Sequence, residues 1–413
     1  MNFRGSRARS LGAVLISGLL LSACTSTSGD DGSSETTKES GRPVELTSNV
    51  KAQAKQVRVD TLVTVGAENG EVQDVTLRDA AGKKSVKGSV QDGTWKATQR
   101  LEPGTSYVLT ATGEGTDDKV KQLKQTFTTQ ALTLQQQVYP SVAPLRGETV
   151  GVGMPIIVTF DLPVKNRAKF QEHMHVRSDK RVEGSWNWLS DREVHYRPKN
   201  YWPANTKVTV DLDLNSLPAG NGIYGQRGQS VPFTIGSRMV SVVDVANHQM
   251  RVTKDGKTIR TLPVTTGDAT HQTRQGTKVI MEKFDSVDMD AASTGVDADA
   301  PDYYNIQGVK WAMRLTNSGE FVHAAPWSVG SQGRANVSHG CTGMSTANAG
   351  WLYSVSKRGD IIKYVNSPRG LEDQNGWTDW NVSWSDWLEG SAIQEGADPS
   401  PTASSATTPN PNA

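Results

Sequence analysis

The stretch that decides the fold runs His323-Ala-Ala-Pro-Trp-Ser-Val-Gly-Ser-Gln-Gly-Arg-Ala-Asn-Val-Ser338-His339-Gly340-Cys341. It places two histidines before a single cysteine, and the glycine ahead of that cysteine lets backbone groups approach closely. An imidazole within reach of a thiol can activate the sulfur as a nucleophile. Backbone N–H groups from His339 to Cys341 can bind the oxyanion that forms when this nucleophile attacks an amide carbonyl. The stretch therefore predicts acyl transfer, with a buried structural cysteine beside incidental histidines as the alternative.

A helix is predicted directly downstream of Cys341. Ser345 is a good N-cap, the segment from Thr346 to Lys357 has apolar residues at helical spacing, and Gly359 fits its end. A thiol just ahead of a helix N-terminus lies near the positive end of the helix dipole. We therefore expect the thiolate form of Cys341 to be favoured over the thiol.

The residues around this stretch predict a β-rich domain over residues 237–366. Apolar residues alternate with polar ones, as in strands that bury one face, and Lys254-Asp-Gly-Lys257 has the composition of a hairpin turn. The first three strands are expected to form a meander because only short turns separate them. The expected strands are 239–245, 247–252, 259–264, 277–281 and 319–322.

Residues 45–236 are predicted to form two β-sandwiches. Gly-Thr-Trp at 93–95 recurs as Gly-Ser-Trp at 184–186, which divides the region into modules over 45–130 and 131–236. Each module has the size of an immunoglobulin-like sandwich. The segments with strand-like alternation are 56–65, 107–111, 156–160 and 207–214.

The N-terminus is predicted to be a cleavable export signal over residues 1–23. A basic head precedes an apolar segment that is too short to cross a bilayer as a mature helix. Its end, Leu21-Ser-Ala-Cys24, resembles the lipobox of bacterial lipoproteins, in which the cysteine is lipidated; an ordinary signal peptide is the alternative. Residues 24–44 then form a disordered tether that holds the folded part off the extracytoplasmic face of a membrane, in the cell wall space.

Composition narrows the classes of partner. Lys and Arg total 44 against 43 Asp and Glu, so the net charge of +1 gives no reason to expect nucleic acid. Two cysteines exclude a disulfide-dense scaffold and a zinc cluster built mainly on thiolates. His173 and His175 share one face of a strand, but without a third ligand nearby a solvated pair is favoured over a metal site. We expect no metal and no cofactor.

A histidine, fourteen further residues and then Ser-His-Gly-Cys resembles the motif of the L,D-transpeptidase catalytic domain, also called the YkuD domain. The flanking sequences, Phe-Val-His-Ala-Ala-Pro-Trp at 321–327 and Arg-Gly-Asp-Ile-Ile at 358–362, also resemble the actinobacterial members. The resemblance covers almost the whole chain. It implies a mainly β protein, with two Ig-like β-sandwich domains followed by a β-rich catalytic domain that has one or two short helices.

The resemblance also implies a peptidoglycan cross-linking enzyme. Cys341 attacks the carbonyl of the third stem residue, a diaminopimelate, releases the terminal D-Ala of a tetrapeptide donor and forms a thioester. The side-chain amine of a diaminopimelate on a second stem then takes the acyl group. By the family's pattern His323 is the base, held in its tautomer by a backbone carbonyl. His339 and Gly340 shape the oxyanion site, Ser338 orients the loop, and carbapenems are expected as covalent inhibitors.

The family's substrate contacts carry over less directly. Tyr304 aligns with the lid tyrosine, although Tyr303 remains an alternative because the alignment needs a gap of one residue. The other substrate contacts implied by the resemblance are Ser318, Gly319, Asn336 and Gly343.

One departure from the family's pattern follows the nucleophile. Thr342-Gly343 replaces the usual hydrophobic residue and Asn, which predicts altered substrate contact with activity retained. The missing amide also leaves open a second function, a wall-associated lipoprotein that binds stem peptides without turning them over. A sortase or papain-like protease is disfavoured, because here the base lies shortly before the nucleophile.

Three further segments carry predictions. The acidic segment 285–302 is either a mobile flap over the cleft or a solvated surface loop. The Trp-rich segment 367–394 is expected to pack as a subdomain on its own domain rather than to stack on sugars. Residues 395–413 are rich in Pro, Ser, Thr and Asn and are expected to be disordered.

Overall fold

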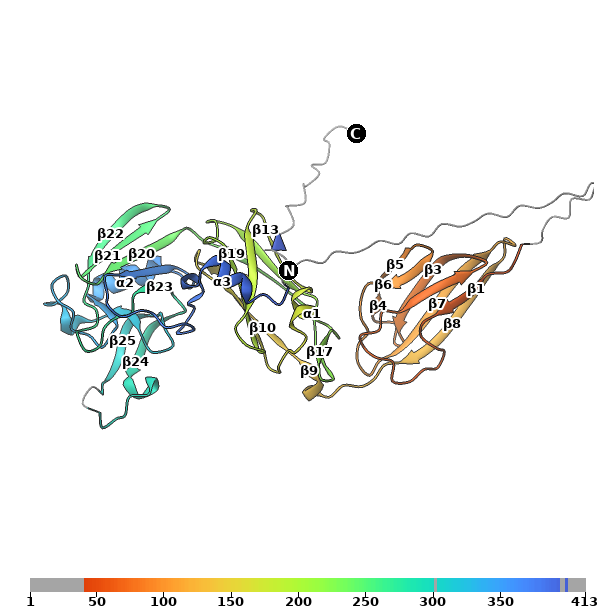
Figure 1. Cartoon of the computed structure of the whole chain (residues 1–413), viewed down its shortest axis with the longest axis horizontal. Coiled ribbons are helices and arrows are strands. Elements are labelled where there is room, and N and C mark those ends of the chain that lie inside the picture. Colours follow the sequence, from red (N-terminus) through yellow and green to blue (C-terminus); the bar gives the residue numbers. More distant parts are fainter. Residues whose placement is uncertain (1–40, 301–302, 394–397, 400–413) are drawn as a thin grey trace, which may run out of the picture.

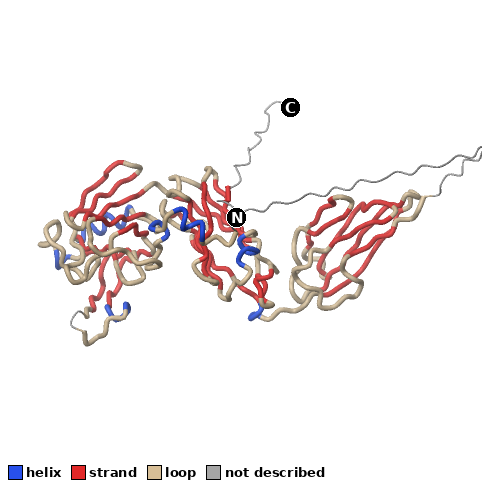
Figure 2. The backbone as a smooth tube through the Cα atoms, in the orientation of Figure 1, coloured by secondary structure: helices blue, strands red, loops and turns tan. Residues whose placement is uncertain are grey.

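The structure, a computed structural model, describes residues 41–300, 303–393 and 398–399. The predicted export signal, Cys24 and the tether up to residue 40 lie outside the described residues, and so does most of the C-terminal tail. Figure 1 shows three bodies in chain order, and Figure 2 shows that strands dominate each of them.

Two four-stranded sheets form the first β-sandwich, with strand orders β1-β2-β6-β5 and β4-β3-β7-β8. Trp95, Tyr107 and Phe127 lie in its core, where the rings of Tyr107 and Phe127 stack with 5.4 Å between their centroids. The strands are β1 (Glu45–Ser48), β2 (Thr64–Glu68), β3 (Gly70–Asp79), β4 (Ser85–Val86), β5 (Gly88–Gln91), β6 (Thr94–Ala97), β7 (Ser106–Gly115) and β8 (Val120–Thr128).

The second β-sandwich has sheets ordered β10-β12-β15-β14-β29 and β11-β19-β16-β13, with a small sheet β17-β18-β9 beside them. Four aromatic residues, Trp186, Trp188, Tyr196 and Trp202, fill much of its core. Its elements are η1 (Leu134–Gln136), β9 (Gln137–Val138), β10 (Pro140–Ala143), β11 (Thr149–Val150), β12 (Ile156–Phe160), α1 (Arg167–Gln171), β13 (Met174–Ser178), β14 (Glu183–Trp188), β15 (Glu193–Pro198), β16 (Lys207–Leu212), β17 (Pro218–Gly220), β18 (Ile223–Gly225), β19 (Gln229–Ile235) and β29 (Asp398–Pro399).

The catalytic domain consists of two mixed sheets, ordered β22-β21-β20-β28-β23 and β24-β25-β26-β27. Helix α2 packs on β25 and β26, and Ser345 caps it by accepting a hydrogen bond from the N–H of Asn348. The elements are β20 (Met239–Asp244), β21 (Gln249–Lys254), β22 (Lys257–Pro263), β23 (Gly276–Val279), β24 (Glu282–Asp290), η2 (Ala291–Thr294), β25 (Asn305–Arg314), β26 (Phe321–Ala324), η3 (Pro326–Ser328), β27 (Thr342–Met344), α2 (Thr346–Val355) and β28 (Ile361–Val365).

Most expected strands of the catalytic domain are present, and so is the meander. Its hairpin turn places Asp255 and Gly256 at positive φ, which suits the Asp-Gly pair. The strand expected at 56–65 is mostly absent, because only Thr64 and Val65 belong to β2. Gln56 there has a φ of 60°, which breaks the extended conformation. The fold class predicted from the sequence is confirmed.

Two residues of the predicted tail are described, and they form a short strand. Within the segment expected to be disordered, β29 pairs antiparallel with β14, with Pro399 opposite Glu183 and Asp398 opposite Gly184. An edge strand offers unpaired backbone groups to any extended segment within reach, and the tail supplies one.

The tryptophans of the C-terminal segment pack mainly on the second sandwich, whereas the residues ahead of them bond to their own domain. We call residues 367–393 the C-terminal brace; it includes η4 (Asp379–Asn381) and α3 (Trp384–Glu389). The indole N–H of Trp387 donates to the carbonyl of Ser185 at 3.0 Å. Arg197 of β15 lies against three indole rings, those of Trp380, Trp384 and Trp387, at 4.6 to 5.2 Å.

The brace also bonds to the catalytic domain. The side chain of Asn381 accepts from the N–H of Thr277 in β23 at 2.7 Å and donates to its carbonyl at 2.8 Å. The second sandwich and the catalytic domain also touch directly, because the N–H of Gly153 donates a hydrogen bond to the carbonyl of Gly359. The brace therefore ties the second sandwich to the catalytic domain.

A buried histidine links the sandwich to the brace electrostatically. His195, whose side chain is 3% exposed, bonds through Nδ1 to Asp379 at 2.7 Å and through Nε2 to Glu193 at 2.9 Å. Burial alone lowers the pKa of His195, but the two carboxylates outweigh it and raise that pKa to about 9. His195 is therefore a cation at neutral pH.

We expect the junction to become less stable at alkaline pH, because His195 loses its positive charge there. The folded-state pKa lies above the unfolded value of about 6.5, so the stabilisation is complete below pH 6.5 and is lost as the pH rises through about 9. We expect His195→Gln to lower the free energy of unfolding by on the order of 3 kcal/mol at pH 6 and by much less at pH 10. Calorimetry of both proteins at the two pH values measures this; an equal loss at both would contradict it.

Among the described residues, no helix has both the length and the apolar character needed to span a membrane.

Candidate active site

Two neighbouring parallel strands bring the predicted nucleophile and base together. In the β26–β27 pair, Val322 lies opposite Thr342 and His323 opposite Gly343. Cys341 directly precedes β27, so it lies beside β26. Because side chains alternate between the faces of a sheet, Cys341 and Gly343 share one face with His323. The register of this pair therefore assembles the site.

The loop ahead of β27 is shaped by Ser338 and Gly340. Gly340 has a φ of +115°, a conformation that favours glycine. The Ser338 hydroxyl donates to the carbonyl of Cys341 at 2.6 Å and accepts from the N–H of Gly340 at 3.2 Å. Ser338 thus joins the two ends of this loop. The N–H of Gly340 is engaged with this hydroxyl, so an oxyanion could use it only after that bond opens.

The Cys341 sulfur is held between two backbone groups of the segment before His323. The thiol donates to the carbonyl of Gly319 and accepts from the N–H of Phe321, both at 3.4 Å. Cys341 is 8% exposed, and burial raises its thiol pKa to about 11. The prediction of a favoured thiolate is therefore wrong. Helix α2 begins only after β27, so desolvation outweighs its dipole, which acts within about a turn.

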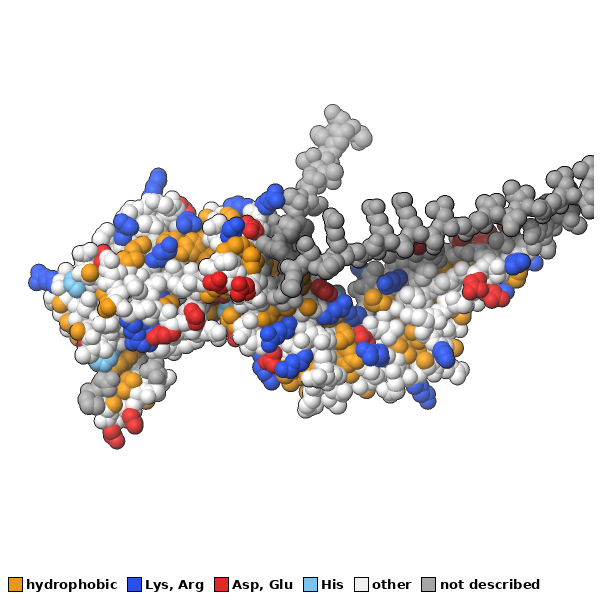
Figure 3. Space-filling view, viewed as in Figure 1, with side chains coloured by type: hydrophobic (Ala, Val, Ile, Leu, Met, Phe, Trp, Pro, Cys, Tyr) orange, Lys and Arg blue, Asp and Glu red, His pale blue; other side chains and the backbone are white. Residues whose placement is uncertain are grey.

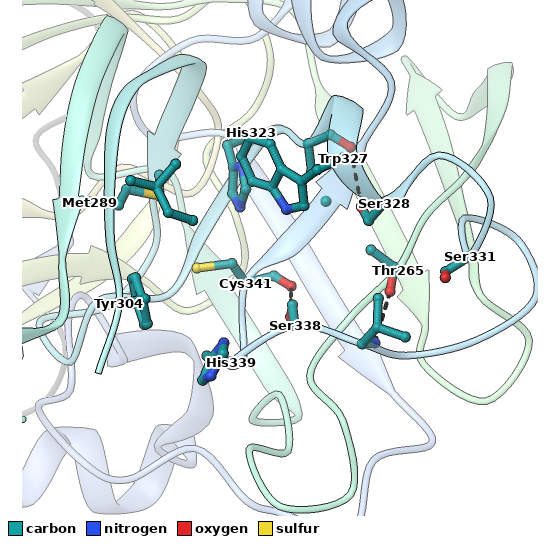
Figure 4. A pocket seen from close by; sticks show the side chains of 14 residues that line it. Thr265, Met289, Tyr304, His323, Trp327, Ser328, Ser331, Ser338, His339 and Cys341 are labelled. Atoms are coloured by element: carbon teal, nitrogen blue, oxygen red, sulfur yellow. Dashed lines mark hydrogen bonds between the residues drawn. The ribbon is translucent and has the colours of Figure 1, made fainter. Parts of the chain in front are cut away.

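His323 is held as a neutral base. Its Nδ1 lies 2.8 Å from the carbonyl of Ala324, and since a carbonyl only accepts, Nδ1 carries the proton. Burial lowers the pKa of His323 below its usual value, and that hydrogen bond opposes the shift. Nε2 is left as the proton acceptor. Figure 4 shows His323 on one side of Cys341 and His339 on the other.

A pocket of about 380 Å³ surrounds the sulfur. Of the two tyrosines considered for the lid, Tyr304 lines the pocket and Tyr303 does not. His339 is exposed, with its ring centroid 5.0 Å from that of Tyr304 and 4.5 Å from that of His271. The lining residues are Thr265, Met289, Tyr304, Ile306, His323, Ala325, Trp327, Ser328, Ser331, Val337, Ser338, His339, Cys341 and Gly343.

Two predicted substrate contacts lie elsewhere. Asn336 does not line the pocket; its side-chain oxygen accepts from the N–H and hydroxyl of Thr266, and its amide donates to the carbonyl of Val245. It therefore anchors the loop instead of facing substrate. Ser318 is exposed and bonds to Asn375 of the brace. Gly319 contacts the sulfur through its carbonyl.

The Thr342-Gly343 departure has a packing explanation. A Cβ at Gly343 would lie 2.9 Å from the Ala325 methyl and 3.1 Å from a methyl of Thr265. The space that a side chain would need is therefore occupied. The Thr342 hydroxyl bonds to the hydroxyl of Tyr364 at 2.7 Å, which satisfies both buried groups.

We therefore expect that replacing Gly343 by asparagine, the residue usual in the family, destabilises this protein. Gly343→Asn should lower the free energy of unfolding by about 1–3 kcal/mol because it overpacks the floor of the pocket. It should also slow acylation of Cys341. Gly330→Asn is the matched control, since a Cβ there meets nothing within 4 Å. Thermal melts measure the effect, and equal stability of the two variants would contradict the explanation.

The acidic segment contributes part of the pocket wall. Its first residues belong to β24, and Met289 at the end of that strand lines the pocket with Tyr304. Figure 3 shows this hairpin as a projection with acidic side chains at its tip and hydrophobic ones on its flank. The side facing the site is apolar, because Met289 and Tyr304 pack with Val309, Phe321 and Cys341.

The sequence analysis did not predict many of the residues that line the pocket. Trp327, which is 57% exposed, stacks on His323 with 5.9 Å between ring centroids. Its place four residues after the base was a usable signal, because residues so close in sequence can contact each other across a bend in the chain. Thr265 and Met289 gave no such signal, since they reach the pocket only through tertiary packing.

Two family models match the chain, one over the region of the sandwiches and one over the domain that carries Cys341. Residues 54–218 match the bacterial Ig domain, and residues 238–363 match the L,D-transpeptidase catalytic domain. The chain is 34% identical over 351 residues to L,D-transpeptidase 2 of Mycobacterium tuberculosis, which covers 84% of this chain and 85% of that protein. It is also 34% identical to L,D-transpeptidase 5 of the same species, covering 84% and 75%.

A solved structure of L,D-transpeptidase 3 from Mycobacterium tuberculosis, in complex with a faropenem-derived adduct, is 31% identical. It covers 55% of this chain and 97% of its own, with a TM-score of 0.46. The identity to L,D-transpeptidase 2 over most of both chains decides the assignment. The chain belongs to the L,D-transpeptidase family, with Ig-like sandwiches preceding its catalytic domain.

Proposed function

We propose that the protein is a peptidoglycan L,D-transpeptidase that links diaminopimelate residues of two stem peptides. The observation that carries the proposal is the pairing of the Cys341 thiol with neutral His323 on adjacent strands at the floor of a pocket. A thiol and an imidazole so placed can transfer an acyl group from an amide to an amine through a thioester. The binding-only alternative is not favoured, because nucleophile and base lie together in one pocket.

The first half of the reaction forms the acyl-enzyme. Nε2 of His323 accepts the thiol proton while the sulfur of Cys341 bonds to the carbonyl carbon of the third stem residue. The bond from that carbonyl to D-Ala then breaks, and the departing amine takes the proton from His323. Because burial favours the neutral forms of both groups, the charge pair exists only along this reaction path.

The second half transfers the acyl group. The diaminopimelate amine of the acceptor attacks the thioester, and His323 takes a proton from it. The carbon–sulfur bond breaks, and the proton returns to the sulfur of Cys341. The apolar wall formed by Met289, Tyr304 and Trp327 limits access of water to the thioester, which favours transfer over hydrolysis.

Carbapenems are proposed to acylate the same sulfur. Attack on the β-lactam carbonyl breaks the carbon–nitrogen bond of the ring, so the opened drug stays attached as a thioester. The pocket of about 380 Å³ is in the range of small-molecule sites.

A product assay tests the proposal. Purified protein is incubated with disaccharide-tetrapeptide, and mass spectrometry follows release of D-Ala and formation of a dimer joined between third residues. We expect both products, in equal amounts. A pentapeptide stem is the matched control, since the residue after its third residue is no longer terminal. Binding of the tetrapeptide without release of D-Ala would refute catalysis.

We further propose that Cys24 is lipidated and anchors the protein on the extracytoplasmic face of a membrane. The support is the sequence of the export signal, which ends in Leu-Ser-Ala before this cysteine. The sandwiches then act as a spacer between anchor and active site. Labelling of cells with a fatty-acid analogue tests this, with Cys24→Ala as the variant that should lose the label and appear in the medium.

A further inference from the structure

A buried ion pair lies behind the nucleophile, and the reaction described above does not use it. Lys278 of β23 and Glu320, which precedes β26, are in direct contact, with side chains 0% and 5% exposed. The ammonium of Lys278 also lies 3.9 Å from the ring centroid of Tyr364. Replacing a buried ion pair by apolar residues is often neutral or stabilising, so stability alone does not explain this pair.

The carboxylate of Glu320 is fixed from several directions. Besides Lys278, it accepts from the backbone N–H of Arg274 at 3.0 Å and from the guanidinium of Arg274 at 3.1 Å. Arg274 in turn contacts Glu372 of the brace. The N–H of Glu320 itself donates to the hydroxyl of Thr316 at 2.9 Å. Both the side chain and the backbone of Glu320 are therefore held in place.

Glu320 stands between the two groups that hold the sulfur. The carbonyl before it, Gly319, accepts from the Cys341 thiol, and the N–H after it, Phe321, donates to the same sulfur. Its carboxylate also lies against the other side of the nucleophile loop, with Oε1 3.7 Å from where a Cβ at Gly340 would be. Movement of Glu320 would therefore displace both backbone contacts of Cys341.

We propose that Glu320, held by Lys278 and Arg274, is a positioning residue that fixes the Cys341 sulfur for acyl transfer. The proposal rests on the proposed function. Glu320 acts through the peptide groups on either side of it and through its charge. It touches neither substrate nor the reacting atoms of substrate.

The charge effect has a definite sign. The negative Glu320 disfavours the thiolate of Cys341, and the positive Lys278 and Arg314 favour it. Burial acts in the same direction as Glu320. The charged and titratable groups around this thiol are Glu320, Lys278, Arg314, Tyr304, Tyr364, His323 and His339.

Two single variants separate this role from a merely structural one. In the purified full-length protein, Glu320→Gln should raise the rate of Cys341 alkylation by iodoacetamide at pH 8.5 by about tenfold, and Lys278→Met should lower it by a similar factor. Mass spectrometry of the peptide that carries Cys341 separates its signal from that of Cys24. Changes in the same direction, or no change in either variant, would overturn the proposal.

Acylation should respond differently from alkylation. Glu320→Gln is expected to slow acylation by a carbapenem by about tenfold although its thiol alkylates faster, because the sulfur is no longer held in register with His323. Local unfolding would also expose the buried thiol and speed its alkylation, so the slower alkylation expected for Lys278→Met distinguishes the charge effect from unfolding. Acylation that speeds up in parallel with alkylation would overturn the positioning role.

A double variant controls for a loss of folding in the single variants. Glu320→Gln leaves Lys278 without its carboxylate, whereas Glu320→Gln with Lys278→Met removes both charges. This double variant should keep the wild-type melting temperature and still acylate about tenfold more slowly. Wild-type acylation in it would refute the positioning role.

The control variant is Lys283→Met, which removes a half-buried lysine of the same domain whose ammonium donates to the carbonyls of Tyr353 and Ser356. It should leave the alkylation rate of Cys341 unchanged. Because alkylation needs no stem peptide, the charge effect can be measured even if the proposed cross-linking reaction fails.

Discussion

Cys341→Ala is expected to abolish covalent acylation by a carbapenem completely. The wild-type protein should gain the full mass of the drug, because ring opening expels no group, and the variant should gain none. The reason is that Cys341 is the sulfur at the floor of the pocket, and among the described residues it is the free cysteine. Intact-mass spectrometry of both proteins after the same incubation measures the result.

The control for this result is Cys24→Ala, which removes the other cysteine of the sequence. It should acylate as the wild type does. An adduct that persists in Cys341→Ala would identify a different nucleophile and would remove the basis of the proposed function.

His323→Gln is expected to lower kcat/KM by about 10²–10⁴-fold, the usual contribution of a positioned acid or base. Glutamine preserves much of the volume but cannot accept the thiol proton. Because burial lowers the pKa of His323, the wild-type activity should be constant through neutral pH and fall only below pH 6.5. Acylation rates from pH 4.5 to 8.5 measure both effects.

The acylation rate of His323→Gln should not fall at acid pH as that of the wild type does, since the variant lacks the imidazole that titrates. His339→Gln is the comparison, because His339 lines the same pocket but is exposed. We expect it to lose less than about tenfold. If the two histidine variants were equally impaired, the assignment of the base to His323 would not hold.

The sequence was sufficient to predict the fold class and the central pair of the site. Alternation marked the strands of the catalytic domain, and the spacing from His323 to Cys341 matched a motif whose residues the structure brings into one pocket. Ser338, a third residue of that motif, bonds to the carbonyl of Cys341. These features are local, and local patterns are what a single sequence carries most reliably.

Predictions that depended on surroundings were less successful. The thiolate was expected from the helix that follows Cys341, but burial, which no local pattern reveals, raises the thiol pKa. Asn336 was expected to face substrate, yet Thr266 and Val245 hold its amide. The ion pair of Lys278 and Glu320 joins residues 42 positions apart. Such pairings follow from tertiary packing and not from spacing.

The C-terminal brace was predicted to pack on its own domain, and its contacts with the second sandwich were not predicted. Tryptophans at intervals of three and four predict a packed face without specifying its partner. The partner became visible only through Arg197 of the second sandwich, which lies against the rings of Trp380, Trp384 and Trp387.

That brace has a practical consequence for anyone who dissects the molecule. Residues 237–393 expressed alone would turn several indole rings, now covered by a neighbouring body, toward water, and self-association would follow. Removal of the last 47 residues from 367 onward would instead strip Arg197 of its aromatic cover. The smallest soluble unit of this enzyme should therefore begin at the second sandwich and retain the brace.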